Sequence, residues 1–139
     1  MTRVLVDTGP LVAILSRDDQ YHDACVATLR KMSGPLFSCW PVVTEAAWLL
    51  RNSPRAVQQL LRGIDGGFLE LLPIAGSEAD AVADLMKQYE EIRPQLADVS
   101  LVYLAIRERI ETNFTLDRRD FSIYRSGRKR GFRLMPDVD

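Results

Sequence analysis

Histidine and cysteine are scarce in this chain of 139 residues, which contains one histidine and two cysteines. A nucleophilic site of the Ser–His or Cys–His type needs a histidine beside its nucleophile, and His22 stands alone in a polar stretch, so we expect it at the surface. Cys25 and Cys39 lack the spacing of metal ligands and are expected to be buried free thiols. This scarcity argues against nucleophilic catalysis, a zinc site and a disulfide framework.

Long apolar runs are also absent. The N-terminal run covers only residues 4–6 before Asp7 interrupts it, and no small-residue cleavage site follows, so we expect neither a membrane span nor a secretion signal. A soluble, cytoplasmic protein is the expectation. With 47% hydrophobic residues, the chain can form one domain over residues 1–139 whose core needs neither disulfides nor a structural metal.

Neither sign of charge is in large excess, because 18 lysines and arginines stand against 19 acids. The cations are nevertheless unevenly distributed: seven of them lie between residues 118 and 133, together with one acid, Asp120. Guanidinium groups bind phosphates, so this basic stretch is a candidate surface for a phosphate backbone, and a solvated C-terminal tail is the alternative. The seven cations are Arg118, Arg119, Arg125, Arg128, Lys129, Arg130 and Arg133.

The N-terminal segment has the pattern of a buried strand that ends at an acid. Residues 4–6 show no polar alternation, as in a strand covered on both faces, and Asp7 follows directly. Pro10 then indicates a helix start, with Thr8 or Gly9 as its cap. Open α/β sheets bind ligands beyond the carboxyl ends of their strands, so Asp7 would lie at such a crevice, although taken alone it is more simply a helix cap.

Two further acids stand in apolar helices. The helix predicted over residues 41–51 is apolar nearly all round and is expected to be buried, yet Glu45 lies in its middle, and Leu49 occupies the position of an ion-pair partner. Asp98 lies at or near the first turn of a similar helix over residues 96–106, where by itself it is a helix cap. An acid on such a surface either reaches water or takes part in chemistry.

A second strand candidate also finishes on an acid. Residues 112–117 are predicted to form a strand that ends at Asp117, and in a parallel sheet this end lies on the same edge as the end of residues 4–6. Further strands are predicted at residues 36–40, at residues 68–74 near a sheet edge because of Pro73, and at residues 132–135. The sequence therefore predicts a single α/β domain with helices packed on a parallel sheet.

Four carboxylates thus share one property: each is attached to an apolar element. Two carboxylates about 4 Å apart repel by about 4 kcal/mol at an effective dielectric constant near 20, so a cluster must take up protons or bind a divalent cation. Oxygen ligands without histidine or cysteine favour Mg²⁺ or Mn²⁺ over Zn²⁺. Such an ion can activate water and neutralise a phosphoryl oxygen, which makes a phosphodiester the expected substrate. The four acids are Asp7, Glu45, Asp98 and Asp117.

The ordered motifs of the chain resemble the PIN-domain family, most closely the VapC-type ribonuclease toxins of bacterial toxin–antitoxin pairs, over almost the whole length. The resemblance implies a PIN-like, Rossmann-like sheet of four or five parallel strands with helices on both faces. It also implies an endoribonuclease that depends on Mg²⁺ or Mn²⁺, frequent homodimers, and often a small antitoxin protein that covers the site. The motifs are Val4-Leu5-Val6-Asp7-Thr8, Glu45, Asp98-Val99-Ser100-Leu101 and Phe114-Thr115-Leu116-Asp117-Arg118-Arg119-Asp120-Phe121.

The same resemblance assigns roles by position. It makes Asp7, Glu45, Asp98 and Asp117 the catalytic acids, all of them metal ligands, with Glu45 acting directly or through water. Thr8 and Thr115 match hydroxyl residues beside the first and last acids, Asp120 matches a fifth acid whose place varies, and Gly9 stands where a polar residue is frequent. The RNA-binding residues would then be Arg118, Arg119, Arg125, Arg128, Lys129 and Arg130.

Other classes of protein stay open on the sequence alone. A non-catalytic PIN-like module would bind RNA or protein and keep the acids without productive metal binding, and a housekeeping RNA-processing nuclease would share the chemistry without being a toxin. An aspartyl-nucleophile phosphatase is disfavoured because it needs a second aspartate two residues after Asp7, where Gly9 stands. A receiver domain needs a lysine at a late strand end, and the lysines are Lys31, Lys87 and Lys129.

Overall fold

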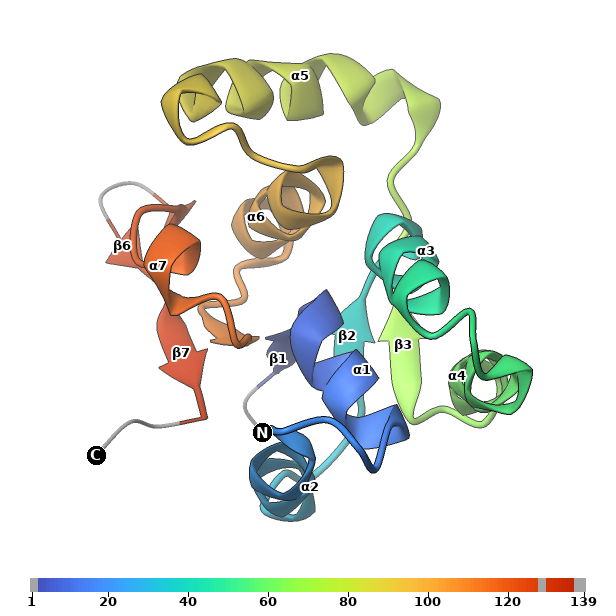
Figure 1. Cartoon of the computed structure of the whole chain (residues 1–139). Coiled ribbons are helices and arrows are strands. Elements are labelled where there is room, and N and C mark those ends of the chain that lie inside the picture. The colour runs from blue at the N-terminus through green and yellow to red at the C-terminus, as the bar shows by residue number, and fades with distance from the viewer. Residues whose placement is uncertain (1–2, 128–129, 137–139) are drawn as a thin grey trace.

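The centre of the computed structural model, which describes residues 3–127 and 130–136, is a sheet of five strands in the order β3-β2-β1-β4-β7 (Figure 1). All neighbouring strands are parallel, so their carboxyl ends lie along one edge. The predicted parallel α/β sheet is therefore confirmed. The strands are β1 (Val4–Val6), β2 (Leu36–Ser38), β3 (Leu69–Leu71), β4 (Thr112–Phe114) and β7 (Arg133–Met135).

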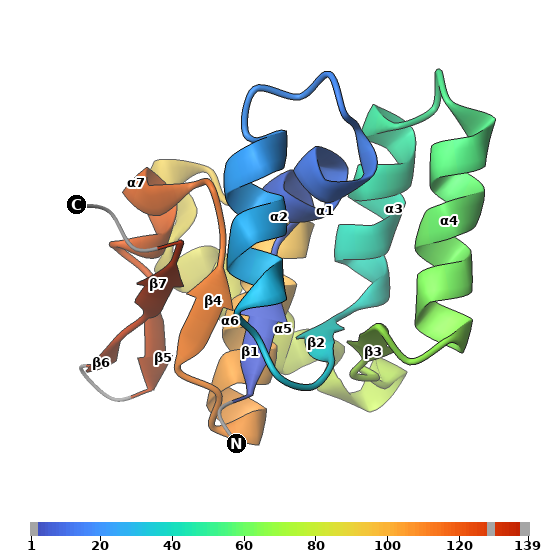
Figure 2. The same cartoon turned by 90° about the horizontal axis from the view of Figure 1, so that it is seen from below.

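Helices cover both faces of this sheet. Helix α6 lies over one face with α5 outside it, and α2 lies over the opposite face (Figures 1 and 2). None of the helices in the described ranges is long and apolar enough to cross a membrane. The helices are α1 (Thr8–Leu15), α2 (His22–Arg30), α3 (Trp40–Leu49), α4 (Pro54–Asp65), α5 (Ala79–Gln88), α6 (Leu96–Glu108) and α7 (Arg118–Phe121), with 3-10 turns η1 (Gly76–Glu78) and η2 (Glu90–Ile92).

The central strand β1 explains why the N-terminal segment is so apolar. It pairs with β2 on one side and β4 on the other, with Val4 opposite both Leu36 and Thr112. All three of its residues are buried, which is the environment that an unbroken apolar run predicts. β3 forms one edge of the sheet, as Pro73 indicated. A separate antiparallel pair, β5 (Arg125–Gly127) and β6 (Arg130–Gly131), packs with β5 against α6.

The sequence left the start of one helix open and misplaced the end of one strand. Asp7 is the N-cap of α1, which confirms the simpler interpretation of this acid over a cap at Thr8 or Gly9. Strand β4 ends at Phe114 instead of continuing to Asp117, because the Thr115 hydroxyl accepts a hydrogen bond from the Asp117 N–H at 2.9 Å and turns the chain out of the sheet. Asp117 is then the N-cap of α7.

Three expectations about exposure have different outcomes. Helix α3 is not buried all round, since the Trp48 and Leu49 side chains are 63% and 52% exposed. Both cysteines are free and buried as predicted, and burial raises the pKa of each thiol to about 11. His22 is half-buried rather than fully at the surface, and its Nδ1 atom lies 2.7 Å from the Ala13 carbonyl oxygen.

Candidate active site

Asp7 lies at the carboxyl end of β1 and uses both carboxylate oxygens. Its Oδ1 accepts a hydrogen bond from the Thr8 N–H at 2.8 Å, which caps α1, and its Oδ2 accepts one from the Thr115 hydroxyl at 2.9 Å. The residue is only 5% exposed. Capping and placement at the crevice are therefore compatible, because one oxygen serves the helix while the other faces the end of β4.

Thr115 joins the first and the last acid of the chain. Its buried hydroxyl donates to Asp7 and accepts from the Asp117 N–H, and Asp117 Oδ1 in turn accepts from the Asp120 N–H at 3.1 Å. A threonine suits this position because one hydroxyl can be donor and acceptor at once. The carboxylates of Asp7 and Asp117 are thus held in a fixed relation, although 110 positions of sequence separate them.

Replacing Thr115 with valine is expected to lower the free energy of unfolding by about 1–2 kcal/mol, because valine keeps the shape but leaves a buried carboxylate oxygen and a backbone N–H without their partner. Urea denaturation measures this change. Thr115→Ser is the matched control and should lose less stability, since it keeps the hydroxyl. Equal losses in both variants would show that packing of the methyl group, not the hydrogen bonds, makes the contribution.

Glu45 reaches the same crevice from α3. Its Oε2 accepts a hydrogen bond from the Thr8 hydroxyl at 3.1 Å, so the first turn of α1 orients a carboxylate that lacks a cation partner on its own helix. The Cβ position at Gly9 is 3.3 Å from the Leu116 side chain, so a small residue allows α1 to approach the segment before Asp117. The glycine at position 9 therefore has a packing explanation.

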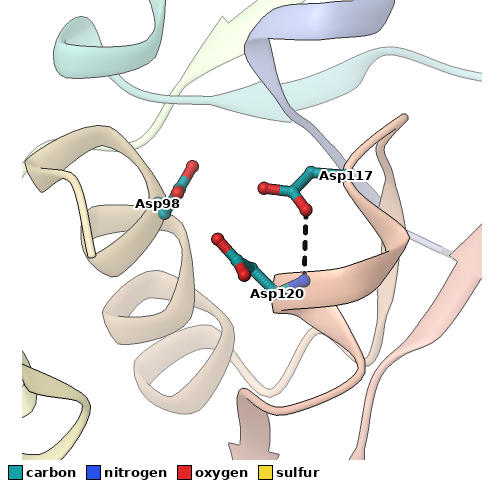
Figure 3. A group of neighbouring side chains, drawn as sticks. All are labelled: Asp98, Asp117 and Asp120. Atoms are coloured by element: carbon teal, nitrogen blue, oxygen red, sulfur yellow. Dashed lines mark hydrogen bonds between the residues drawn. The ribbon is translucent and has the colours of Figure 1, made fainter. Parts of the chain in front are cut away.

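Three aspartates form the tightest group of acids. Asp98 comes from the first turn of α6, Asp117 precedes α7 and Asp120 lies within α7, and their carboxylates point into one shared space (Figure 3). One ligand oxygen from each lies within 4.8 Å of the others. Asp7 and Glu45 line the same cavity of about 540 Å³. The structure thus brings together all four acids singled out in the sequence, and it groups Asp120, the possible fifth acid, with Asp98 and Asp117.

Burial and mutual repulsion shift the protonation of these acids. The pKa of Asp98 is raised to about 8, first by burial and then by the charges of Asp7, Asp117, Glu45 and Asp120. Burial also raises the pKa of Asp7 to about 6, against the opposing effect of its hydrogen bonds from Thr8 and Thr115. The pKa of Asp120 is raised by burial and by Asp117. The cavity therefore disfavours carrying all its negative charges at neutral pH.

This donor set fits a hard divalent cation. Its candidate ligands are carboxylate oxygens, and the histidine and both cysteines lie outside the group of residues that lines the cavity. A bound cation would also relieve the repulsion that raises the pKa of Asp98, because it favours the charged form of each neighbouring carboxylate. The residues best placed to hold it are Asp98, Asp117 and Asp120.

The arginines of the basic stretch have different environments. Arg119 is exposed, and Arg118 is half-buried with its Nη2 atom buried and unpaired. Arg125 is exposed, but its Nη1 atom donates to the carbonyls of residues 122, 123 and 124, so that part of its guanidinium stabilises the end of α7. Arg128 and Lys129, and the side chain of Arg130, lie outside the described residues.

Two polar residues of the cavity wall were not among the sequence candidates. Arg93 and Gln95 both line it, just before α6. In the sequence this segment reads only as the end of one helix before Pro94, so neither residue carries a signal that separates it from other surface residues.

Comparisons with known proteins agree with this fold. The model of the PIN domain family matches residues 4–126. The chain is 32% identical over 124 residues to Ribonuclease VapC26 of Mycobacterium tuberculosis (strain ATCC 25618 / H37Rv), covering 88% of this chain and 92% of that protein. The crystal structure of Mycobacterium tuberculosis VapC20, described as a sarcin–ricin loop cleaving toxin, has a similar fold with a TM-score of 0.72 at 12% identity, covering 79% of this chain and 86% of that one. The chain therefore belongs to the PIN-domain family, among its VapC-type members.

Proposed function

We propose that this protein is a metal-dependent endoribonuclease that hydrolyses phosphodiester bonds of RNA, and that it is the toxin of a toxin–antitoxin pair. The observation that carries the proposal is the convergence of five acids on one cavity at the carboxyl edge of a parallel sheet. A relative that is 32% identical over most of both chains is named a ribonuclease, which supports the same reaction here.

The acids have different roles in the proposed hydrolysis. Asp98, Asp117 and Asp120 would hold Mg²⁺ or Mn²⁺, which when bound lowers the pKa of water and neutralises charge on a phosphoryl oxygen. Thr115 fixes Asp7 relative to Asp117, so that both carboxylates are oriented before substrate arrives. Glu45, oriented by the Thr8 hydroxyl, is the group we assign to accept the proton of the attacking water.

Protein partners are part of the same proposal. Several large apolar side chains are exposed, and apolar surface of this kind is common at protein–protein interfaces. A homodimer and a cognate antitoxin that covers the cavity would each bury some of them, and we propose that the protein acts in the cytoplasm, where RNA is its substrate. The exposed side chains on α3 and at the start of α6 are Trp40, Trp48, Leu49 and Leu96.

Incubating the protein with fluorescent single-stranded RNA and Mn²⁺ should yield fragments with a 5′-phosphate and a 3′-hydroxyl, because water rather than the ribose 2′-hydroxyl attacks phosphorus. Enzymatic end-labelling of the fragments distinguishes these ends. Fragments that carry a 2′,3′-cyclic phosphate would contradict hydrolysis by water. RNA binding without any cleavage would favour a non-catalytic module, and cleavage without growth arrest on expression would favour a housekeeping nuclease.

A further inference from the structure

Arg93 is the cation that lines the acidic cavity. Among the described residues that line the cavity, Arg93 carries the positive charge. Five carboxylates line the same cavity, those of Asp7, Glu45, Asp98, Asp117 and Asp120. RNA that approaches this cavity meets negative charge on its own phosphates and on the wall. A cation at this place has a direct electrostatic effect on whether RNA can enter.

The backbone holds Arg93 in an unusual conformation. Its φ and ψ are 51° and 60°, in the left-handed region, and its N–H donates to the Glu90 carbonyl at 3.0 Å as η2 ends. Pro94 follows at once, and α6 begins at Leu96. This conformation is unfavourable for an L-residue other than glycine, so glycine would be the easier residue if only the turn mattered.

The guanidinium of Arg93 is free to bind a ligand. The residue is exposed, and within the described ranges its side chain has no hydrogen bond or ion pair, although several acids line the same cavity. Arg125 is a contrast, because its guanidinium donates to three backbone carbonyls. A cation that is placed at a strained position and left unpaired can bind an anionic ligand without first breaking a contact.

We propose that Arg93 binds a phosphate of single-stranded RNA as the strand enters the acidic cavity. The proposal rests on the proposed ribonuclease function and names the residue that offsets the charge of the cavity wall for the substrate. A guanidinium can bind two non-bridging phosphate oxygens at once, which fixes the strand as well as attracting it. Arg93 would therefore bind the substrate, whereas the acids would carry out proton transfer.

The test uses glycine at position 93, since glycine removes the guanidinium while suiting the left-handed backbone. Arg109 provides a matched control: it is also an exposed arginine, with φ 57° and ψ 45°, and it lies at the other end of α6. The 13 residues of that helix separate the two positions by roughly 20 Å. Arg109→Gly therefore makes the same backbone change away from the cavity.

Binding of fluorescein-labelled oligouridine is measured by anisotropy in proteins that also carry Asp98→Asn, so that the RNA stays intact. Arg93→Gly should weaken binding by about tenfold and reduce the slope of log K against log salt concentration by about 0.7, the loss of one phosphate contact to a single strand. The melting temperature should not fall. In proteins with Asp98 intact, Arg93→Gly should raise KM for RNA by about tenfold and change kcat by less than about twofold.

Arg109→Gly should leave RNA affinity and its salt dependence unchanged. Equal affinities of the Arg93→Gly and Arg109→Gly proteins, or a drop in kcat without a change in affinity, would overturn the assignment. Because affinity is measured without cleavage, a wild-type protein that binds RNA through Arg93 but does not cut it would contradict the proposed ribonuclease function and leave the role of Arg93 standing.

Discussion

Replacing Asp98 with asparagine should lower the rate of RNA cleavage by at least about 10³-fold and at the same time make the metal-free protein more resistant to heat. Burial and four neighbouring acids raise the pKa of Asp98 to about 8, which means that the folded protein disfavours the charged carboxylate. Without metal, this carboxyl group therefore lowers the stability of the folded state. Asparagine keeps the shape of the side chain but removes its ability to carry that charge and the metal ligand that we propose it supplies. A melting temperature higher by roughly 5 °C in EDTA would accompany the loss of activity.

Asp84 offers the matched control for this substitution, because it is an exposed aspartate on α5 and does not line the cavity. Asp84→Asn should leave both the cleavage rate and the melting temperature near their wild-type values. If expression of the wild-type protein arrests growth, Asp98→Asn should relieve the arrest. An Asp98→Asn protein that cuts RNA within tenfold of the wild-type rate would exclude Asp98 from the catalytic site.

Removing divalent cations should abolish cleavage and make stability depend on pH. With excess EDTA, the melting temperature and the free energy of unfolding should both fall as the pH rises from about 4 to about 8, the free energy by several kcal/mol. Saturating Mn²⁺ at pH 8 should restore most of the loss, since a ligand that binds only the folded state stabilises it. Differential scanning calorimetry over this pH range measures both the fall in stability without metal and its recovery with Mn²⁺.

The direction follows from the two raised pKa values. Asp7 and Asp98 titrate near 3.8 when unfolded but near 6 and 8 when folded. Well below pH 3.8 both groups are protonated in both states and neither lowers the stability. At higher pH the unfolded chain releases its protons first, so folding loses free energy until the folded groups ionise as well. Asp117→Asn should remove the stabilisation by Mn²⁺. A metal-free protein whose stability is flat from pH 5 to pH 8 would argue against a carboxylate cluster.

The acids could be predicted because each interrupts a pattern that physical chemistry otherwise makes apolar. Asp7 follows a strand buried on both faces, and Glu45 and Asp98 stand in helices that pack against the core. Parallel pairing of β1 with β4 then brings residues from both halves of the chain to one edge. Identifying an acid that breaks an apolar element therefore needs only local sequence, and convergence needs only the fold class.

The remaining features depend on side-chain contacts that no local pattern encodes. The end of β4 is set by the Thr115 hydroxyl, which competes with the sheet for the Asp117 N–H, and a threonine before such a turn also suits a continuing strand. Helix α3 is apolar in sequence, but the packing leaves Trp48 exposed. Arg93 has no sequence signal because its importance comes from a left-handed backbone and from the cavity beside it.

The pairing of Asp7 with Thr115 has a consequence for protein synthesis. The ribosome makes Asp7 well before the hydroxyl that orients it, which follows 108 positions later in the chain, and before the two acids of the α7 segment. Until β4 is added, β1 lacks its neighbour on that side and the cavity lacks one wall. A chain that stops before β4 therefore lacks Thr115, Asp117 and Asp120 and cannot form the complete group of acids.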